Sequence, residues 1–200
     1  MRKIALVFVA ALLVGLVAGC AQPPQETIDA ANAAVEGARA SGAAEYAPES
    51  LRAAEDAQAQ LEAEMKAQES KFSLFRSYKK VADLSTAASS AGERALADAQ
   101  AAKARKQEEA RAALDTASSM LAETRSMLEK APRGKGTQAD LAAMKADLDG
   151  AEAALAEAGT AMSSESYLDA LAKAKGATAT VESVKAAVEE AMARKGGRRR

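Results

Sequence analysis

Apolar side chains recur along most of this chain at alternating spacings of three and four residues, the period of a helix that buries one face. The pattern predicts helices over residues 28–40, 48–68, 72–130, 137–162 and 167–194, and it leaves open whether the third is continuous. No stretch shows the alternation of a β-strand. We therefore predict an all-α fold, an elongated Ala-rich bundle of coiled-coil-like helical hairpins. The seam residues are Ile28, Ala31, Val35 and Ala38; Leu51, Ala54, Gln58, Leu61, Met65 and Gln68; Leu114, Ala117, Leu121, Thr124 and Leu128; Leu141, Met144, Leu148, Ala151, Leu155, Ala158 and Met162; and Tyr167, Leu171, Ala174, Thr178, Val181, Val184, Val188 and Met192.

Breaks in the pattern mark the helix ends. Residues 42–47 interrupt the first helix, and Pro48 then suits the first turn of the second, because its fixed φ and missing N–H cost nothing there. Weak helix formers in residues 85–92 favour a bend in the third helix. Residues 132–136 form a loop, Thr137 is the expected N-cap of the fourth helix, and residues 163–166 separate the last two helices.

The two halves resemble each other. Leu51 and Leu141 lie 90 positions apart and Tyr78 and Tyr167 lie 89 apart, each at a similar point of a similar seam. We predict duplicated three-helix units over 27–102 and 112–194. A polar helical connector, 103–111, joins them, with i,i+4 pairing of Arg105 and Glu109. A basic tail, 195–200, is expected to be disordered.

The N-terminus carries an export signal. A basic start and an apolar run over residues 4–17 precede Val17-Ala18-Gly19-Cys20. Small residues directly before a cysteine resemble the bacterial lipobox, which implies cleavage between Gly19 and Cys20 and a covalent lipid on Cys20. Residues 1–19 are then a lipoprotein signal peptide and 20–26 the lipidated cysteine and linker. The alternatives are a plain secretory signal or an uncleaved helix, and the run is shorter than the roughly 20 apolar residues of a membrane span.

The predicted location is a cell membrane of a bacterium. In lipoproteins of two-membrane bacteria an Asp after the lipidated cysteine commonly retains the protein in the inner membrane, and Ala21 stands there instead. The resemblance implies the outer membrane, with the protein facing the periplasm. The membrane is then a partner through the lipid, and no other cofactor is expected.

Composition narrows the chemistry. Without the signal peptide 25 basic and 28 acidic residues remain, a balance that argues against a nucleic-acid partner. The chain has no His and one Cys, so a Ser-His-Asp triad and most zinc sites are excluded. Ser77 and Lys80 match the S-x-x-K spacing of some peptidases, but the accompanying motifs are absent. We predict no enzyme activity, no catalytic or metal-ligating residue and no small-molecule substrate.

One basic-aromatic cluster, residues 71–80, is the candidate contact site with a partner or surface. The alternative is that its aromatic side chains fill the turn between two helices while its cations stay solvated. The tail residues Arg198, Arg199 and Arg200 suggest binding to anionic lipid, or only a solubilising role. The candidate contact residues in the cluster are Phe72, Phe75, Arg76, Tyr78, Lys79 and Lys80.

Residues 42–49, Gly-Ala-Ala-Glu-Tyr-Ala-Pro-Glu, precede an Ala-seamed helix and carry a family resemblance. Together with the alanines of residues 30–40 they resemble the domain of unknown function 4398 family of small bacterial envelope lipoproteins. The resemblance spans residues 28–99, and the second half joins it only by internal similarity. That family often has a Gly-Asp-Tyr-like turn, for which Ser77-Tyr78 and Ser166-Tyr167 are the nearest equivalents. It implies a helical periplasmic domain and no known activity or functional residue.

The sequence thus predicts a lipid-anchored, non-enzymatic helical protein that acts as a periplasmic spacer or scaffold. The alternative is an accessory or chaperone-like subunit of an outer-membrane or secretion complex. An envelope protein or a second copy of the chain is the expected protein partner, because helix seams serve intramolecular bundles and oligomers alike.

Overall fold

The computed structural model describes residues 22–131 and 138–197, and every regular element in them is helical, as predicted. The seven elements are α2 (Gln25–Ala40), α3 (Ala43–Tyr46), α4 (Pro48–Glu69), the 3-10 turn η1 (Ser73–Phe75), α5 (Lys79–Lys130), α6 (Gln138–Ser163) and α7 (Tyr167–Gly197). The chain divides after Ala102 into two compact units, and α5 continues from the first into the second without a break.

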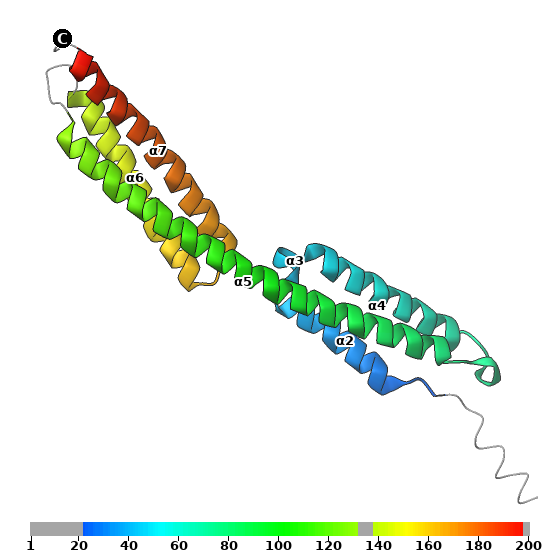
Figure 1. The fold of residues 1–200 in the computed structure, drawn as a ribbon. Helices are drawn as coiled ribbons and strands as arrows, with labels where there is room; N and C mark the ends of the chain where they lie inside the picture. Colours follow the sequence, from blue (N-terminus) through cyan, green and yellow to red (C-terminus); the bar gives the residue numbers. More distant parts are fainter. Residues whose placement is uncertain (1–21, 132–137, 198–200) are drawn as a thin grey trace, which may run out of the picture. The chain divides into compact units, whose positions relative to one another are not determined.

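In the first unit α2, α4 and the beginning of α5 lie side by side (Figure 1). Ala31 of α2, Leu61 of α4 and Val81 of α5 share a buried cluster at the end of the unit where α2 begins and α4 ends. A second cluster lies toward the other end and contains Val35, Ala38, Leu51, Ala54, Ala95 and Ala99. α4 is therefore antiparallel to both neighbours.

Small seam residues let α2 and α5 approach closely. A Cβ atom added at Gly92 of α5 would lie 2.7 Å from the carbonyl carbon of Ala34 in α2, inside any normal contact distance. Polar bonds fix the register at the periphery of the unit. Ser50 of α4 donates to Asp98 of α5 at 2.6 Å, and Gln58 Nε2 donates to Asn32 Oδ1 at 2.9 Å.

The second unit packs the remainder of α5 against α6 and α7 (Figure 1). Its buried cluster is larger and richer in branched side chains, and it includes Leu121, Leu148, Val181 and Val188. Thr124 is fully buried, and among the described residues its hydroxyl has no hydrogen-bond partner. Ion pairs link the helices at the surface. Arg125 of α5 contacts Asp149 and Glu152 of α6, Lys185 of α7 contacts Glu123 of α5, and Lys173 of α7 contacts Glu157 of α6.

A tight turn joins α6 to α7. Glu165 adopts a left-handed conformation with φ of 60°, and the N–H of Ser166 reaches back to the carbonyl of Ala161 at 2.9 Å, a Schellman ending. Lys103 of α5 contacts the Glu165 carboxylate at 2.6 Å and lies 5.9 Å from the ring centroid of Tyr167. The hydrogen bond from Lys103 lowers the pKa of Glu165.

All the predicted seam residues are buried or half-buried in the structure. The predicted break at 42–47 instead contains the single turn α3, which follows Gly42 in a left-handed conformation with φ of 83°. α5 is helical through residues 85–92, where Ser85 bonds to the carbonyl of Val81 at 2.8 Å.

Two further features differ from the expectation. Within residues 103–111 Glu109 pairs with Lys106, not with Arg105, and Ala110 is fully buried. Residues 195–197 belong to α7, since a helix gains one backbone bond for each residue added. Thr137, the loop at 132–136 and Arg198 to Arg200 lie outside the described residues.

The burial pattern is compatible with the predicted duplication, which stays a prediction. The seam of α5 in the first unit and the seam of α7 match position by position at an offset of 89. Seven pairs are buried on both sides: Tyr78 and Tyr167, Val81 and Ala170, Ser85 and Ala174, Ala88 and Ala177, Gly92 and Val181, Ala95 and Val184, and Ala99 and Val188.

Candidate interaction site

The segment between α4 and α5, residues 70–78, presents apolar side chains to solvent, and we name it the aromatic loop. Phe72 is 69% exposed, Leu74 72% and Phe75 75%, and these are the large apolar side chains that stand exposed among the described residues. The rings of Phe72 and Phe75 lie 6.5 Å apart between centroids. Contiguous exposed apolar groups of this kind mark interaction sites on soluble domains.

A buried glutamine organises the base of the aromatic loop. Gln68, only 4% exposed in the last turn of α4, accepts a hydrogen bond from the backbone N–H of Ser77 at 3.0 Å. The same side-chain oxygen accepts a bond from the Lys71 ammonium at 3.2 Å, and its amide nitrogen donates to Glu64 at 2.6 Å. One side chain thus ties both ends of the loop to α4.

Arg76 also holds the aromatic loop in place, through hydrogen bonds to two backbone carbonyls. Its guanidinium donates to the backbone carbonyl of Lys71 at 3.0 Å and to that of Glu69 at 2.9 Å. The carbonyl of Glu69 is one of the groups that a helix leaves unpaired at its C-terminus, so this bond also caps α4. Because Gln68 and Arg76 hold the backbone, the loop keeps its apolar side chains outward.

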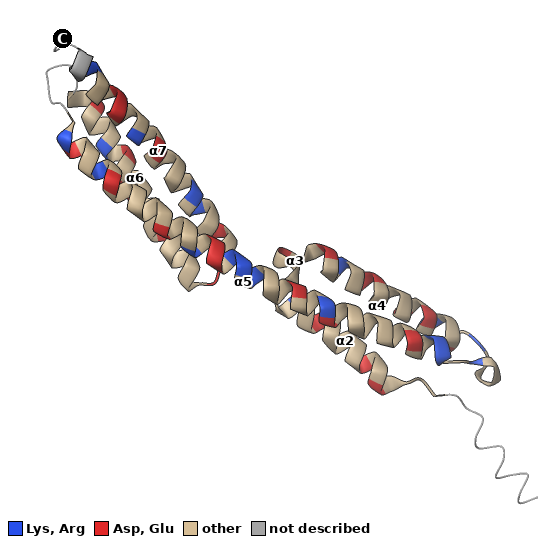
Figure 2. Ribbon diagram, viewed as in Figure 1, with Lys and Arg blue, Asp and Glu red and all other residues tan. Residues whose placement is uncertain are grey.

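Basic residues flank the exposed apolar side chains in the sequence. Lys71, Lys79 and Lys80 are exposed, and Figure 2 shows basic residues at this end of the first unit. Lys80 contacts Glu64 at 2.6 Å. The hydrogen bonds from Lys80 and Gln68 lower the pKa of Glu64, whose side chain is 12% exposed. The Glu64 carboxylate thus links α4 to α5 beneath the loop.

The structure separates the six candidate contact residues of the sequence into three groups. Phe72, Phe75, Lys79 and Lys80 lie on the surface, and the alternative that the phenylalanines fill the turn is wrong. Tyr78, in contrast, is 8% exposed and packs with Leu61, so its expected surface role is corrected to a core role. Arg76 is half-buried, because its guanidinium donates hydrogen bonds to the backbone of the loop.

The sequence analysis did not assign Leu74 or Gln68 to the contact site. The signal for Leu74 is its place between two phenylalanines in a segment that breaks the helix period. Gln68 occupies an apolar seam position, and a polar residue there indicates a buried hydrogen-bonding role. Gly19 and Cys20, the predicted cleavage and lipidation residues, lie outside the described residues.

The aromatic loop lies at the end of the first unit where the described chain begins. Ile28, in the first turn of α2, packs against the cluster that contains Tyr78, the residue that closes the loop. Figure 1 shows the loop and the start of α2 at the same end of this unit. A membrane anchor attached just before α2 would therefore hold this loop near the membrane.

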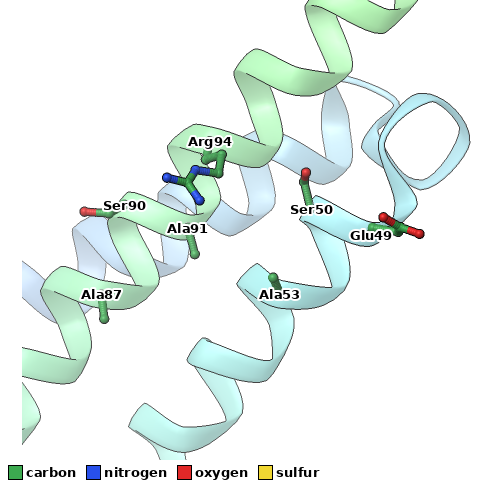
Figure 3. Close-up of a pocket in the computed structure, with 7 residues that line it drawn as sticks. All are labelled: Glu49, Ser50, Ala53, Ala87, Ser90, Ala91 and Arg94. Carbon is green, nitrogen blue, oxygen red and sulfur yellow. The ribbon is translucent and has the colours of Figure 1, made fainter.

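Two grooves between described helices offer no comparable apolar surface. A groove of about 430 Å³ runs between α4 and α5 in the first unit. Figure 3 shows Ala53 and Ala91 between the two helices, while Glu49 and Ser90 point outward on opposite sides. A groove of about 630 Å³ in the second unit, between α5 and α6, includes Leu121, Arg125 and Glu152. Arg125 is already paired with that glutamate.

The S-x-x-K spacing gains no support as a catalytic site. Ser77 offers its backbone N–H to Gln68, and the Lys80 amine contacts Glu64. No group of acidic or cysteine residues suited to a metal occurs in the described part of the chain. Of the helices described, none combines the length and apolar character needed to span a bilayer.

Comparison with known proteins adds no relative. No protein-family model, no curated protein and no solved structure matches this chain. The resemblance of residues 42–49 to the envelope lipoprotein family stays a prediction from those residues.

Proposed function

We propose that this chain is a lipid-anchored, non-enzymatic helical protein of the bacterial cell envelope that serves as a periplasmic spacer or scaffold. One observation carries the proposal: the lipobox-like sequence that ends at Cys20 stands directly before a helical domain. α2 begins at Gln25, so a few residues separate the expected lipid from a folded helix. A domain attached so closely is held at the membrane surface.

The packing favours a mechanical role over a chemical one. Both units are bundles whose seams consist largely of Ala, Val and Leu. Such seams allow close helix approach and leave little room for a ligand. Helix α5 joins the two units without an intervening loop.

The proposed non-enzymatic role rests on side-chain chemistry. The chain has no histidine, and a lipid on Cys20 would consume its one thiol. Where the described acidic side chains have lowered pKa values, ion pairs with Lys or Arg are the cause, as for Glu152 beside Arg125 and Glu157 beside Lys173. Lowered carboxyl pKa values of this origin suit surface ion pairs, whereas a general acid needs a raised one.

Cross-linking in living cells tests the role. The full chain, carrying an internal affinity tag, is compared with a Cys20→Ala variant, and captured proteins are identified by mass spectrometry. The proposal predicts self-links or diffuse capture of abundant membrane neighbours, lost in Cys20→Ala. Capture of one dominant envelope protein, abolished by Phe72→Ser/Phe75→Ser, would contradict the spacer role and establish the accessory subunit in its place.

A further inference from the structure

We propose that the aromatic loop inserts Phe72, Leu74 and Phe75 into the headgroup region of the membrane that holds the lipid of Cys20. The inference deepens the proposed function and rests on it. It gives the first unit a second membrane contact and a defined orientation on the bilayer. The argument uses the position of the loop, its rigidity and its charge.

The first argument is the position of the aromatic loop relative to Cys20. Gln22 is the first described residue, and Cys20 precedes it by two positions. Two residues span at most about 7 Å even when fully extended, so a lipid on Cys20 would fix Gln22 close to the bilayer. The aromatic loop lies at the same end of the first unit, because Ile28 of α2 and Tyr78 share one buried cluster. A lipid on Cys20 would therefore bring the loop close to the bilayer without any change in the fold.

Rigidity is the second argument. Exposed apolar side chains on a free loop would turn inward or fluctuate, whereas this loop is fixed at both ends. Gln68 holds the backbone of Ser77, and Arg76 holds the backbone of Lys71. The outward arrangement of the phenylalanines is therefore present before binding, which lowers the entropy that membrane insertion would cost.

The third argument is that the basic residues near the aromatic loop favour a membrane surface as its partner. Lys71 and Lys79 flank the apolar residues in the sequence and are exposed. Lys80 is also exposed while its ammonium contacts Glu64, and Arg76 bonds to the loop backbone. Aromatic and aliphatic side chains flanked by cations match a bilayer surface with anionic headgroups, because the apolar groups enter the interface and the cations meet the phosphates. A protein groove would satisfy the phenylalanines but would need matching acidic groups around them.

The loop alone would bind a membrane weakly, since it offers three apolar side chains. Beside a lipid anchor its local concentration at the bilayer is high, so weak affinity suffices for lasting contact. The lipid would determine whether the protein is on the membrane, and the loop would determine how the first unit is oriented there.

Site-specific labelling tests the inference on the lipidated protein purified from the envelope. If Cys20 carries lipid, the chain has no other cysteine, so Leu74→Cys provides a single thiol for an environment-sensitive fluorophore. Ser90→Cys provides a matched control, because Ser90 is an exposed residue of α5 in the same unit. Both proteins are reconstituted in vesicles of phosphatidylethanolamine and phosphatidylglycerol that contain a lipid-borne quencher.

The expected result is a blue-shifted, quenched label at position 74 and an unquenched label at position 90. Adding Phe72→Ser/Phe75→Ser is expected to weaken the quenching at position 74, with the inserted population falling on the order of tenfold for each phenylalanine removed. Vesicles of phosphatidylcholine alone, which lack net charge, are expected to give weaker quenching.

A label at position 74 that stays in water on protein that floats with the vesicles would overturn the inference while leaving the anchor intact. Failure of the anchor looks different. Cys20 would then be free to react, so each protein would carry two fluorophores and would not float with the vesicles.

Discussion

The side-chain oxygen of Gln68 accepts the backbone N–H of Ser77 at 3.0 Å and closes the aromatic loop across nine residues. Gln68 is nearly buried, and its amide nitrogen is satisfied by Glu64. The loop is thus fixed by a residue of the preceding helix together with Arg76 of the loop itself. This arrangement leaves the phenylalanines free to meet a membrane.

Gln68→Ala is expected to loosen the aromatic loop. The substitution removes the acceptor of the Ser77 N–H and leaves Glu64 without one donor, at a cost of about 1–3 kcal/mol. Amide hydrogen exchange at residues 70–78 is expected to accelerate, and the unfolding free energy to fall. Gln60→Ala is the matched control, since Gln60 is an exposed residue of α4. Equal protection of the loop in both variants would contradict the role of Gln68.

Gly92→Ala and Gly150→Ala are expected to change stability in opposite directions. At Gly92 the new methyl group would lie 2.7 Å from backbone of α2, and overpacking of this kind costs about 1–3 kcal/mol. At Gly150 in α6 nothing lies within 4 Å of the added Cβ, so the better helix propensity of Ala stabilises by up to about 1 kcal/mol. Thermal unfolding followed by circular dichroism measures both. A stabilised Gly92→Ala would show that α2 and α5 are not in close contact.

A comparison of Tyr78→Ala with Phe75→Ala distinguishes a buried side chain of the aromatic loop from an exposed one. Tyr78 is 8% exposed and packs with Leu61 and Val81, so its truncation is expected to cost on the order of 3 kcal/mol. Phe75 is 75% exposed, and its truncation is expected to change the unfolding free energy by less than about 0.5 kcal/mol. Denaturant titration measures the difference, and equal losses for both variants would contradict the assignment.

The stability of the first unit is expected to depend on pH through Glu64. Hydrogen bonds from Lys80 and Gln68 lower the pKa of Glu64 below its ordinary value of 4.5. A lowered carboxyl pKa contributes stability that is present above the ordinary value and is lost as the pH falls through the lowered one. Glu64→Gln is therefore expected to be less stable than the natural chain near neutrality, and the difference should shrink at an acidic pH well below 4.5.

The control for this pH effect is Glu62→Gln, which changes an exposed carboxylate of the same helix. Unfolding by urea at both pH values gives the comparison. A difference between Glu64→Gln and the natural chain that is the same at both pH values would contradict the ion pair as its origin.

The helical fold follows from the sequence because burial repeats with the helix period. Leu148 and Val181 lie on predicted seams and are fully buried. The start of α4 follows from Pro48, whose fixed φ suits a first turn. These features depend on neighbours three or four residues away, which a linear sequence displays directly.

The candidate site depends on contacts between residues that are farther apart in the sequence, so the sequence predicts it only in part. Hydrophobicity ranks Phe75 above Tyr78 for burial, yet the structure buries Tyr78 and exposes Phe75. The reversal arises because Arg76 bonds to the carbonyl of Glu69, seven residues earlier, and this closes the turn before α5 begins. A side-chain bond to a distant backbone group leaves no periodic signal.

Identifying the first residue of the mature chain is the most direct test of the proposed lipid anchor. The full chain is expressed in a two-membrane bacterium, its membranes are isolated, and the N-terminal peptide of the protein is analysed by mass spectrometry. We predict that the peptide begins at Cys20 and carries a diacylglyceryl group on its sulfur. A mature chain that begins elsewhere, or a Cys20 with a free thiol on protein recovered in the soluble fraction, would contradict the lipid anchor and with it the proposed envelope role.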